Sequence, residues 1–489
     1  MLGFRLHRTV QYQEKGDSIY LIMDYPLKVI ILDPMWKRVM GIMRKDKFIS
    51  FKDIIPLVGH NKPERVEAFL NTLVRKGFLE SRGYLYQTEY PFVSVIIPVR
   101  NRPEAISDCL ESLERIDYPG DKIEVVVVDD ASDDMTPEIA SQFPVHLVQL
   151  KNHRQASFCR NLAVRKARGE VLAFIDSDCI ADPLWLTEII PAFNDPACCA
   201  VGGLIDSFYN NKGLDRYEKV KSPLNMGNLP KRSSERDPFF YVPSCNLLVR
   251  KNVFLKLGGF KEDLCVGEDV DFCWRFQDQG YDLEYRPLGT VYHKHRNSMG
   301  QFCARRFDYG TSEPLLQQFH AKRVKNFVLP ISSAVFWSLI LFYFATGLIS
   351  LPGICVIILI TECIFKWVNI RKKNIPIHFL NLTIAIFRSY LSLLYHSCAF
   401  ISRYYLFWSL PFLFLWPLLS VTILAVHLLT GVVEYIVKKP RLNFPYFLLL
   451  FTLDQLFYQL GVWWGCLKSF SFGPVNPRIR RNPLPEDLR

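Results

Sequence analysis

Between residues 93 and 175, short apolar runs of strand length alternate with segments of helical periodicity. The apolar runs lie at residues 93–99, 123–128, 145–150 and 171–175. Strands that are apolar along their whole length are buried on both faces, as in parallel sheets that helices cover on each side. The alternation therefore predicts an α/β domain with a mostly parallel sheet, whose ligands bind at the carboxyl ends of the strands.

Carboxylates follow two of these predicted strands. Asp129 and Asp130 end the second strand, and Asp176 and Asp178 follow the fourth. Two carboxylates one residue apart can share a divalent cation with a diphosphate, because Mg²⁺ takes few protein oxygens and completes its shell with phosphate and water. A polar loop that caps the next helix is the alternative. No G-x-G-x-x-G or G-x-x-x-x-G-K-[ST] follows a strand, which disfavours dinucleotide and P-loop sites.

Residues 1–88 are predicted to form a separate module with strands at 18–23 and 28–32, helices beginning near 35, 51 and 63, and a hairpin over 78–86. This winged-helix-like α+β order resembles the peptide-recognition domains of the pyrroloquinoline-quinone-D type, which implies binding of a leader peptide. A packing domain is the alternative. Nucleic-acid binding is disfavoured because the last helix carries few net positive charges: Arg65, Arg75, Lys76, Glu64, Glu67.

Four motifs within residues 92–180 resemble those of the family 2 glycosyltransferases, which have the GT-A fold. They read V-S-V-I-I-P-V-R-N-R-P-E from Val93, V-V-V-D-D-A-S from Val126, C-R-N-L-A from Cys159 and F-I-D-S-D from Phe174. The resemblance implies a UDP-sugar donor and a bound Mg²⁺ or Mn²⁺. The implied donor-binding residues are Pro98, Arg100, Asp129, Asp130 and Asp176. The implied metal ligands are Asp176 and Asp178 together with His293 or, alternatively, His295, and both histidines are otherwise surface groups.

The segment G-E-D-V-D-F from Gly267 begins a predicted helix. Glu268 and Asp269 resemble the catalytic acidic pair of this family, and we assign the role of general base to Asp269. Inversion at an anomeric carbon needs such a base, since the acceptor hydroxyl must lose its proton on the face opposite the diphosphate. An acidic first turn that stabilises the start of the helix is the alternative, and both roles are compatible.

Arg305 and Arg306 follow in the segment Q-F-C-A-R-R-F from Gln301. Processive members of the family carry Gln-x-x-Arg-Trp near this point, and the present segment departs from that pattern and has no tryptophan. The departure argues against synthesis of a long polymer. Arg305 and Arg306 remain candidates for contact with the diphosphate of the donor, because guanidinium groups bind phosphate in a bidentate manner.

The last third of the chain is predicted to be a membrane region over 323–472, followed by a basic tail over 473–489. Four spans are expected, at residues 328–351, 353–367, 377–400 and 404–437, whereas 446–467 is interpreted as an amphipathic or re-entrant helix. Basic residues between the spans and the lack of an amino-terminal signal place the catalytic domain, 89–322, in the cytoplasm beneath the inner membrane. The net charge of +11 is then explained by contact with anionic lipid.

The whole arrangement resembles the glycosyltransferases of mycofactocin systems. That implies transfer of glucose from UDP-glucose to a peptide-derived redox cofactor or its precursor, as a short β-1,4-glucan. Two alternatives remain: a family 2 enzyme that uses a lipid acceptor or makes an extracellular polysaccharide, and a silent scaffold that docks peptide at the membrane. The oligomeric state is left open.

Overall fold

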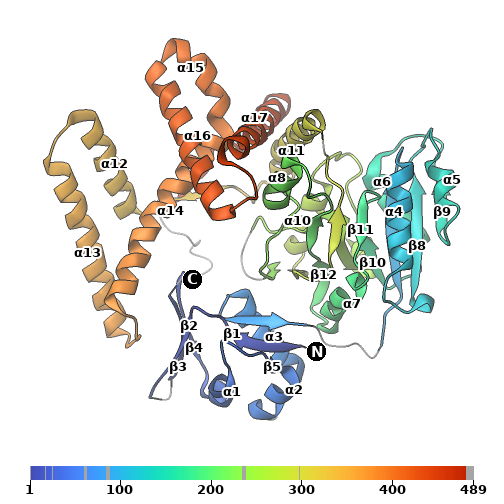
Figure 1. The fold of residues 1–489 in the computed structure, drawn as a ribbon, viewed down its shortest axis with the longest axis horizontal. Coiled ribbons are helices and arrows are strands. Elements are labelled where there is room, and N and C mark those ends of the chain that lie inside the picture. Colours follow the sequence, from blue (N-terminus) through green and yellow to red (C-terminus); the bar gives the residue numbers. More distant parts are fainter. Residues whose placement is uncertain are drawn as a thin grey trace.

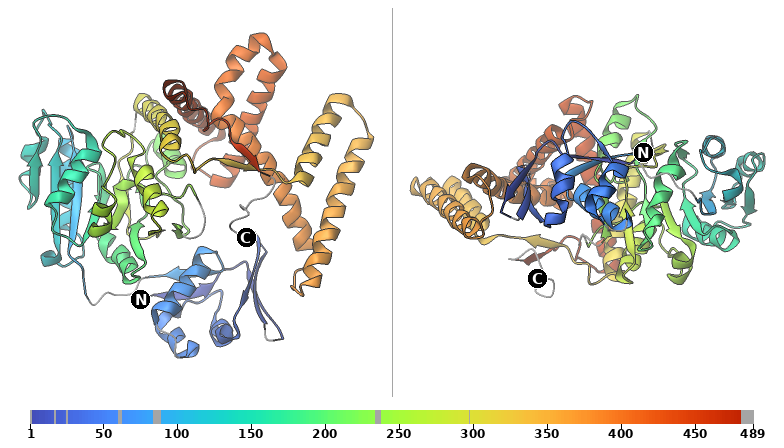
Figure 2. Two further views of the ribbon diagram at one scale, coloured as in Figure 1. Left: turned by 180° about the vertical axis from the view of Figure 1, so that it is seen from behind. Right: turned by 90° about the horizontal axis from the view of Figure 1, so that it is seen from below.

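The computed structural model describes residues 2–16, 18–24, 26–59, 63–83, 89–233, 238–296 and 298–480. Three parts are visible in Figure 1: an amino-terminal module, a domain built on a long sheet, and a group of carboxyl-terminal helices. The module lies beneath the other two parts, and the helices stand beside the sheet domain in both side-on views (Figures 1 and 2).

The central sheet has eight strands in the order β14-β16-β12-β15-β10-β7-β8-β9. Only β15 and β14 run against the others, because β15 pairs antiparallel with both β10 and β12, and β14 pairs antiparallel with β16. The predicted α/β class with a mostly parallel sheet is therefore confirmed. The strands are β7 (Val93–Val99), β8 (Ile123–Asp129), β9 (His146–Gln149), β10 (Val171–Phe174), β12 (Cys198–Gly202), β14 (Lys231–Arg232), β15 (Leu247–Arg250) and β16 (Asp282–Tyr285).

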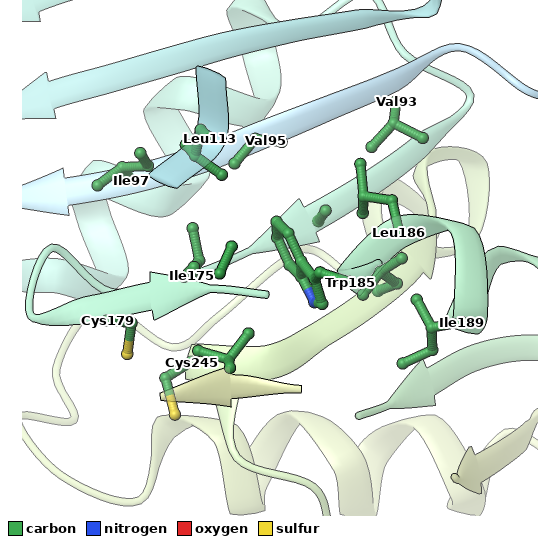
Figure 3. Packing of buried hydrophobic residues seen from close by; sticks show 14 of the residues in the cluster. Val93, Val95, Ile97, Leu113, Ile175, Cys179, Trp185, Leu186, Ile189 and Cys245 are labelled. Atoms are coloured by element: carbon green, nitrogen blue, oxygen red, sulfur yellow. The ribbon is translucent and has the colours of Figure 1, made fainter. Parts of the chain in front are cut away.

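Helices cover both faces of this sheet. One face is covered by α4 (Pro103–Glu114), α5 (Thr136–Ala140) and α7 (Trp185–Ile189), and the other by α6 (Gln155–Lys166), α9 (Lys251–Lys256) and α10 (Glu268–Asp278). Figure 3 shows the first face, where Trp185 fills the space between the strands and the helix that carries Leu186 and Ile189. Every residue of β7 is buried, which agrees with its unbroken apolar sequence.

Pairing of the strands brings the predicted acids to one edge. Val99 of β7 lies opposite Asp129 of β8, and Phe174 of β10 lies opposite Ile96 of β7. β7 and β8 therefore end side by side, whereas β10 ends earlier, opposite Ile96, so that the turn after β10 lies beside the last residues of β7. This is the edge at which a parallel sheet binds its ligands.

The apolar and aromatic residues between 283 and 292 do not form one continuous strand. The chain instead forms β16, leaves the central sheet at Pro287, and re-forms as β17 (Val291–His293) in a small sheet with β11 (Cys179–Ala181) and β13 (Ile205–Ser207). Gly289 adopts φ +58° at the bend, and proline cannot donate to a sheet. The break turns His293 toward the loop that follows β10.

The amino-terminal module has its own apolar core. Two three-stranded sheets, β5-β1-β6 and β2-β3-β4, surround its helices. The elements are β1 (Gly3–Leu6), β2 (Val10–Lys15), β3 (Ser18–Asp24), β4 (Leu27–Leu32), α1 (Lys37–Ile42), β5 (Ile49–Ser50), α2 (Phe51–Ile54), α3 (Pro63–Arg75) and β6 (Leu79–Arg82). β6 pairs with β1, and the second strand of the predicted hairpin lies outside the described residues.

The carboxyl-terminal helices are α12 (Ile331–Thr346), α13 (Ser350–Lys372), α14 (Phe379–Tyr405), α15 (Ser409–Leu415), α16 (Pro417–Lys438) and α17 (Phe444–Ser469). Within the described residues, three helical stretches are long and apolar enough to cross a membrane: Ser350–Lys372, Phe379–Leu415 and Pro417–Lys438. Four spans were expected, but only these three meet the criteria of length and hydropathy, because α12 has only 16 residues. α17 is not among them, and it buries Asp454, Gln455 and Gln459.

The boundaries of two predicted spans also differ. Pro352 falls between the spans expected at 328–351 and 353–367. In the structure it lies in the first turn of α13, where the missing backbone N–H of proline costs nothing. The single long span expected at 404–437 is broken before Pro417, where Trp416 adopts φ −142° and ψ 76°. A residue that precedes proline avoids the helical region, so α15 ends there and α16 begins anew.

Helix α17 packs against α11 (Met299–Phe319) at backbone contact distance. A Cβ atom added to Gly310 would lie 2.1 Å from the carbonyl oxygen of Tyr458, and one added to Gly461 would lie 2.0 Å from that of Phe307. Only glycine fits at such positions, as in the small-residue contacts of membrane helices. The two helices run in parallel, since Arg306 pairs with Asp454 and, further along both, Gln318 pairs with Ser469.

Candidate active site

A cleft of about 570 Å³ opens at the carboxyl edge of the sheet. It is lined by residues from β7, the turn after β10, the start of α10, the strand β17 and helix α11. Of the residues singled out from the sequence, the cleft brings together Pro98, Arg100, Asp130, Asp176, Asp178, Glu268, Asp269, His293, Arg305 and Arg306. Asp129 is not part of the lining.

Arg160 joins the two acidic motifs of this cleft. Its guanidinium is buried and donates to Asp176 Oδ1 at 2.6 Å and to Glu268 Oε1 at 2.9 Å. Helix α6 carries this arginine beneath the floor of the cleft, where it compensates two carboxylates from different elements. The ion pairs therefore fix the start of α10 relative to the turn after β10.

Asp178 is surrounded by two arginines and a histidine. Arg102 donates to Asp178 Oδ2 at 2.9 Å, His293 Nε2 lies 3.6 Å from Oδ1, and Arg296 lies 3.8 Å from Oδ2. Burial favours the neutral acid, but these neighbours prevail and hold the pKa of Asp178 below its ordinary value. Asp178 is therefore a carboxylate at neutral pH.

Possible ligand atoms of Asp178, Cys179 and His293 lie within 4.8 Å of one another, and this group does not include the predicted ligand Asp176. The carboxylate and the imidazole of this group suit Mn²⁺ or Mg²⁺. Cys179 also lies within reach of Asp178 and His293. Burial raises the pKa of its thiol well above the ordinary value, so it stays protonated and is a poor ligand for a hard cation.

Asp269 is held at the amino-terminal end of α10 by backbone donors. The backbone N–H of Ser244 donates to Oδ2 at 3.3 Å, and that of Val270 donates to Oδ1 at 2.8 Å. Desolvation, followed by the charge of Glu268, raises the pKa of Asp269 to about 7. A carboxylate with a pKa near neutrality is suited to take a proton from a hydroxyl group.

Asp129 and Asp130 are both buried but differ in their contacts. Asp130 accepts from His153 Nδ1 at 2.7 Å and from the backbone N–H groups of Arg154 and Gln155 at 2.7 and 2.9 Å. Asp129 Oδ2 accepts from the backbone of Ser132, whereas its Oδ1 has no hydrogen-bond partner among the described residues. Asp130 therefore lines the cleft, whereas Asp129 does not.

The two adjacent arginines of α11 have different surroundings. Arg305 is exposed to the cleft, and its guanidinium lies 4.7 Å from the centre of the Tyr309 ring. Arg306 is buried and donates to Glu218 Oε1 at 2.5 Å and to Asp454 Oδ1 at 2.9 Å. Of the two, Arg305 is the one whose charge stays available for a ligand, while Arg306 links α11 to α8 (Gly213–Lys221) and α17.

A second cavity, of about 390 Å³, adjoins the cleft at Asp269. Val266, Gly267, Asp269 and Tyr309 line both spaces. The second cavity continues between the sheet domain and the helices α14 and α17. Asp269 therefore lies at the junction of the cleft and the second cavity.

Several residues of the cleft escaped prediction from the sequence. Arg102 and Arg160 lie within the motifs that begin at Val93 and Cys159, but neither motif indicates their partners, and Arg296 and Tyr309 carry no sequence signal. For Arg160 the motif was the one available clue, because a charged residue inside a helix that must cover a sheet needs a buried partner.

Comparisons with known proteins identify relatives among the glycosyltransferases. Residues 94–258 match the family model described as Glycosyl transferase family 2. The chain is 27% identical over 406 residues to a protein of Mycobacterium tuberculosis named "Pre-mycofactocin glycosyltransferase", an alignment that covers 79% of this chain and 82% of that one. It is 34% identical over 221 residues to "Glycosyltransferase AglE" of Haloferax volcanii, covering 42% of this chain and 70% of that one.

Among solved structures, the chain is similar to the mannosyltransferase PcManGT from Pyrobaculum calidifontis in complex with GDP-Man and Mn²⁺. The TM-score is 0.40 at 18% sequence identity, over 67% of this chain and 94% of that one.

Proposed function

This chain belongs to the family 2 glycosyltransferases, and from that premise we propose that it transfers glucose from UDP-glucose to a peptide-derived, pre-mycofactocin-like acceptor with inversion. The single observation that carries the chemistry is Asp269, a carboxylate with a pKa of about 7 in the same cleft as Asp176 and Asp178. The similarity to the mycobacterial protein over most of the chain supports the acceptor.

In the proposed reaction, Asp269 accepts the proton of an acceptor hydroxyl while that oxygen bonds to the anomeric carbon. The bond from this carbon to the diphosphate oxygen breaks, and its electron pair leaves with UDP. Pro98, Arg100 and Asp130 bind the nucleoside, and the exposed charge of Arg305 contacts the diphosphate. Arg160 orients Asp176 and Glu268. It thereby fixes the donor-binding side of the cleft relative to the side that carries Asp269.

Asp176, Asp178 and His293 would hold Mg²⁺ or Mn²⁺. A divalent cation at this position neutralises charge that develops on the departing diphosphate.

We assign the parts of the chain as expected from the sequence: a peptide-recognition module (1–88), a cytoplasmic catalytic domain (89–322), a membrane region (323–472) and a basic tail (473–489). Contacts between the module and the membrane helices support a combined unit. Asn381 of α14 donates to Asp24 at 2.6 Å, and Lys15 donates to the carbonyl oxygen of Asn374. A peptide held by the module would stay close to the membrane.

A lipid acceptor is the second candidate. The observation that favours it is the second cavity, which extends from Asp269 toward the apolar helix α14.

The test is release of UDP by the full-length protein in detergent, given UDP-glucose and Mg²⁺ or Mn²⁺. The protein is incubated without acceptor, with the decarboxylated Val-Tyr-derived acceptor, or with membrane lipid, and the products are analysed by mass spectrometry. Hexose increments on the peptide-derived molecule support the proposal. Labelled lipid with an unmodified peptide-derived molecule supports the second candidate, and no acceptor-dependent UDP in either case contradicts both.

The pH dependence of glycosyl transfer should follow the protonation state of Asp269. The base acts only when deprotonated, and its pKa is raised to about 7, so kcat/KM should rise tenfold per pH unit below about 7 and level off above it. The measurement is the initial rate of UDP release from pH 5 to 9. A profile that stays flat down to pH 5 would contradict this assignment.

A further inference from the structure

Residues other than glycine rarely adopt a left-handed backbone, and in the part of the chain that the structure describes the following do so: Asn101, Ala131, Gln155, Asn374, Lys439 and Phe470. The last three follow α13, α16 and α17, and helices commonly end in this conformation. The first three follow β7, β8 and β9, at the edge of the sheet where the cleft opens. Of these three, Gln155 alone lines the cleft, and its φ of +73° is the largest of the six.

The left-handed conformation of Gln155 serves a backbone contact. Its backbone N–H donates to Asp130 Oδ2 at 2.9 Å. Glycine would make the same contact without the steric cost that a Cβ atom brings in this region of φ and ψ. The glutamine side chain therefore carries a cost that the backbone contact does not require, and strain of this kind concentrates at ligand sites.

The side chain of Gln155 contacts the segment that precedes the proposed base. Its Oε1 accepts from Cys265 Sγ at 3.1 Å, and both residues line the cleft. Cys265 belongs to the segment 261–267, which lies between α9 and α10 and leads into Asp269. The amide nitrogen of Gln155 has no hydrogen-bond partner among the described residues, so it is available to a ligand in the cleft.

Helix α6 also holds this part of the chain before and after Cys265. Asn161 donates to the carbonyl oxygen of Phe260 at 2.8 Å and accepts from its backbone N–H at 2.9 Å. Arg160 pairs with Glu268, and Asn161 and Arg160 are both buried. The contact at Cys265 differs, because the thiol is exposed and is a weak donor. It is therefore the one of the three contacts that a ligand in the cleft alters most readily.

We propose that Gln155 couples donor binding to the placement of the base: its amide N–H donates to an oxygen of the bound UDP-sugar, while its carbonyl oxygen holds Cys265. The inference rests on the proposed glycosyltransferase function and adds a positioning residue to it. A bound donor fixes the glutamine between the nucleotide and Cys265. The segment 261–267 is then held in place ahead of Asp269, and the thiol of Cys265 becomes less accessible.

Cys265 provides the readout, since the structure describes all thirteen cysteines of the chain and this is the exposed one. The rate at which N-ethylmaleimide alkylates Cys265 is measured by peptide mass spectrometry on the full-length protein in detergent with Mn²⁺, without UDP and with saturating UDP. Calorimetry gives the Kd of UDP, and thermal unfolding gives the stability. The variants are Gln155→Gly and Gln155→Glu. Lys439→Gly is the control, because Lys439 is also left-handed but ends α16 and lines neither the cleft nor the second cavity.

We expect UDP to slow alkylation of Cys265 at least tenfold in the wild type and less than twofold in Gln155→Gly, and the Kd of UDP to rise at least tenfold in that variant. Gln155→Gly should nevertheless unfold at the wild-type temperature or above it, since glycine suits the left-handed conformation. Gln155→Glu keeps an oxygen for Cys265 but lacks the amide donor, so it should weaken UDP binding by a similar factor. Lys439→Gly should change neither the protection nor the Kd.

Equal protection of Cys265 in the wild type and in Gln155→Gly would overturn the proposal, because UDP would then shield the thiol without the glutamine. Unfolding of Gln155→Gly well below the wild-type temperature would also overturn it, since the side chain would then serve the fold. Failure of the proposed function has a separate signature. In that case the protection and the Kd still depend on Gln155, but no hexose is transferred to the peptide-derived acceptor or to lipid.

Discussion

Replacement of Asp269 by asparagine should lower the turnover of glycosyl transfer by about a thousandfold. Asparagine has the same shape and keeps one of the two oxygens, so it retains one of the hydrogen bonds that the backbone N–H groups of Ser244 and Val270 donate to Oδ2 and Oδ1. It cannot take a proton from the acceptor hydroxyl. Because the substitution removes no buried ion pair, the fold and the affinity for UDP-glucose should change little.

The measurement is kcat from acceptor-dependent UDP release, together with the Kd of UDP from calorimetry. Asp263→Asn is the matched control, since Asp263 is an exposed acid of the preceding turn and does not line the cleft. Turnover of Asp269→Asn above about a tenth of the wild-type value would show that another group is the base.

Loss of Arg160 should damage stability and activity together. Arg160→Met removes the buried cation that Asp176 and Glu268 share, and it leaves two carboxylates facing each other. Breaking a buried ion pair costs about 3–5 kcal/mol. The Asp176 side chain is 30% exposed and recovers some hydration, so we expect a loss of about 2–3 kcal/mol in the free energy of unfolding. Transfer should fall below detection because the donor and base sides of the cleft separate.

Thermal unfolding of the detergent-solubilised protein and UDP release test this expectation. Arg168→Met is the control, because Arg168 also pairs with a glutamate but its side chain is 75% exposed, and surface pairs contribute about 0–1 kcal/mol. Arg160→Lys should keep the charge yet lose one of the two partners, giving an intermediate stability. If Arg160→Met unfolded at the wild-type temperature with full activity, the bridging role would be wrong.

Much of the catalytic domain follows from local sequence. The unbroken apolar runs of β7, β8 and β10 and the acids after β8 and β10 are enough to predict a parallel sheet with an acidic edge. That edge is where the structure brings Asp130, Asp176 and Asp178 into one cleft. These features depend on residues that are close in the chain, which is why periodicity and spacing reveal them.

Features that depend on distant partners could not be predicted in this way. Nothing near Arg160 indicates that it bridges Asp176 and Glu268, and nothing near Arg306 indicates Glu218 and Asp454. Pro287 separates β16 from β17, and Pro417 separates α15 from α16. Both prolines can be read from the sequence, but the apolar residues on each side of them favour one continuous element. The second cavity exists only because three parts of the chain meet there.

The parallel contact of α11 with α17 has a consequence for the order in which the protein is made. Asp454 is 148 residues further along the chain than Arg306, its partner. At about 5–20 residues per second, a ribosome adds that stretch in roughly 7–30 seconds, and until then the amino-terminal parts fold without it. Until α17 docks, Arg306 of the nascent catalytic domain therefore has Glu218 as its one carboxylate partner among the residues already made. The contact that joins α11 to α17 forms only after Asp454 has been added, so a ribosome that stalls before this residue releases a protein whose cleft lacks it.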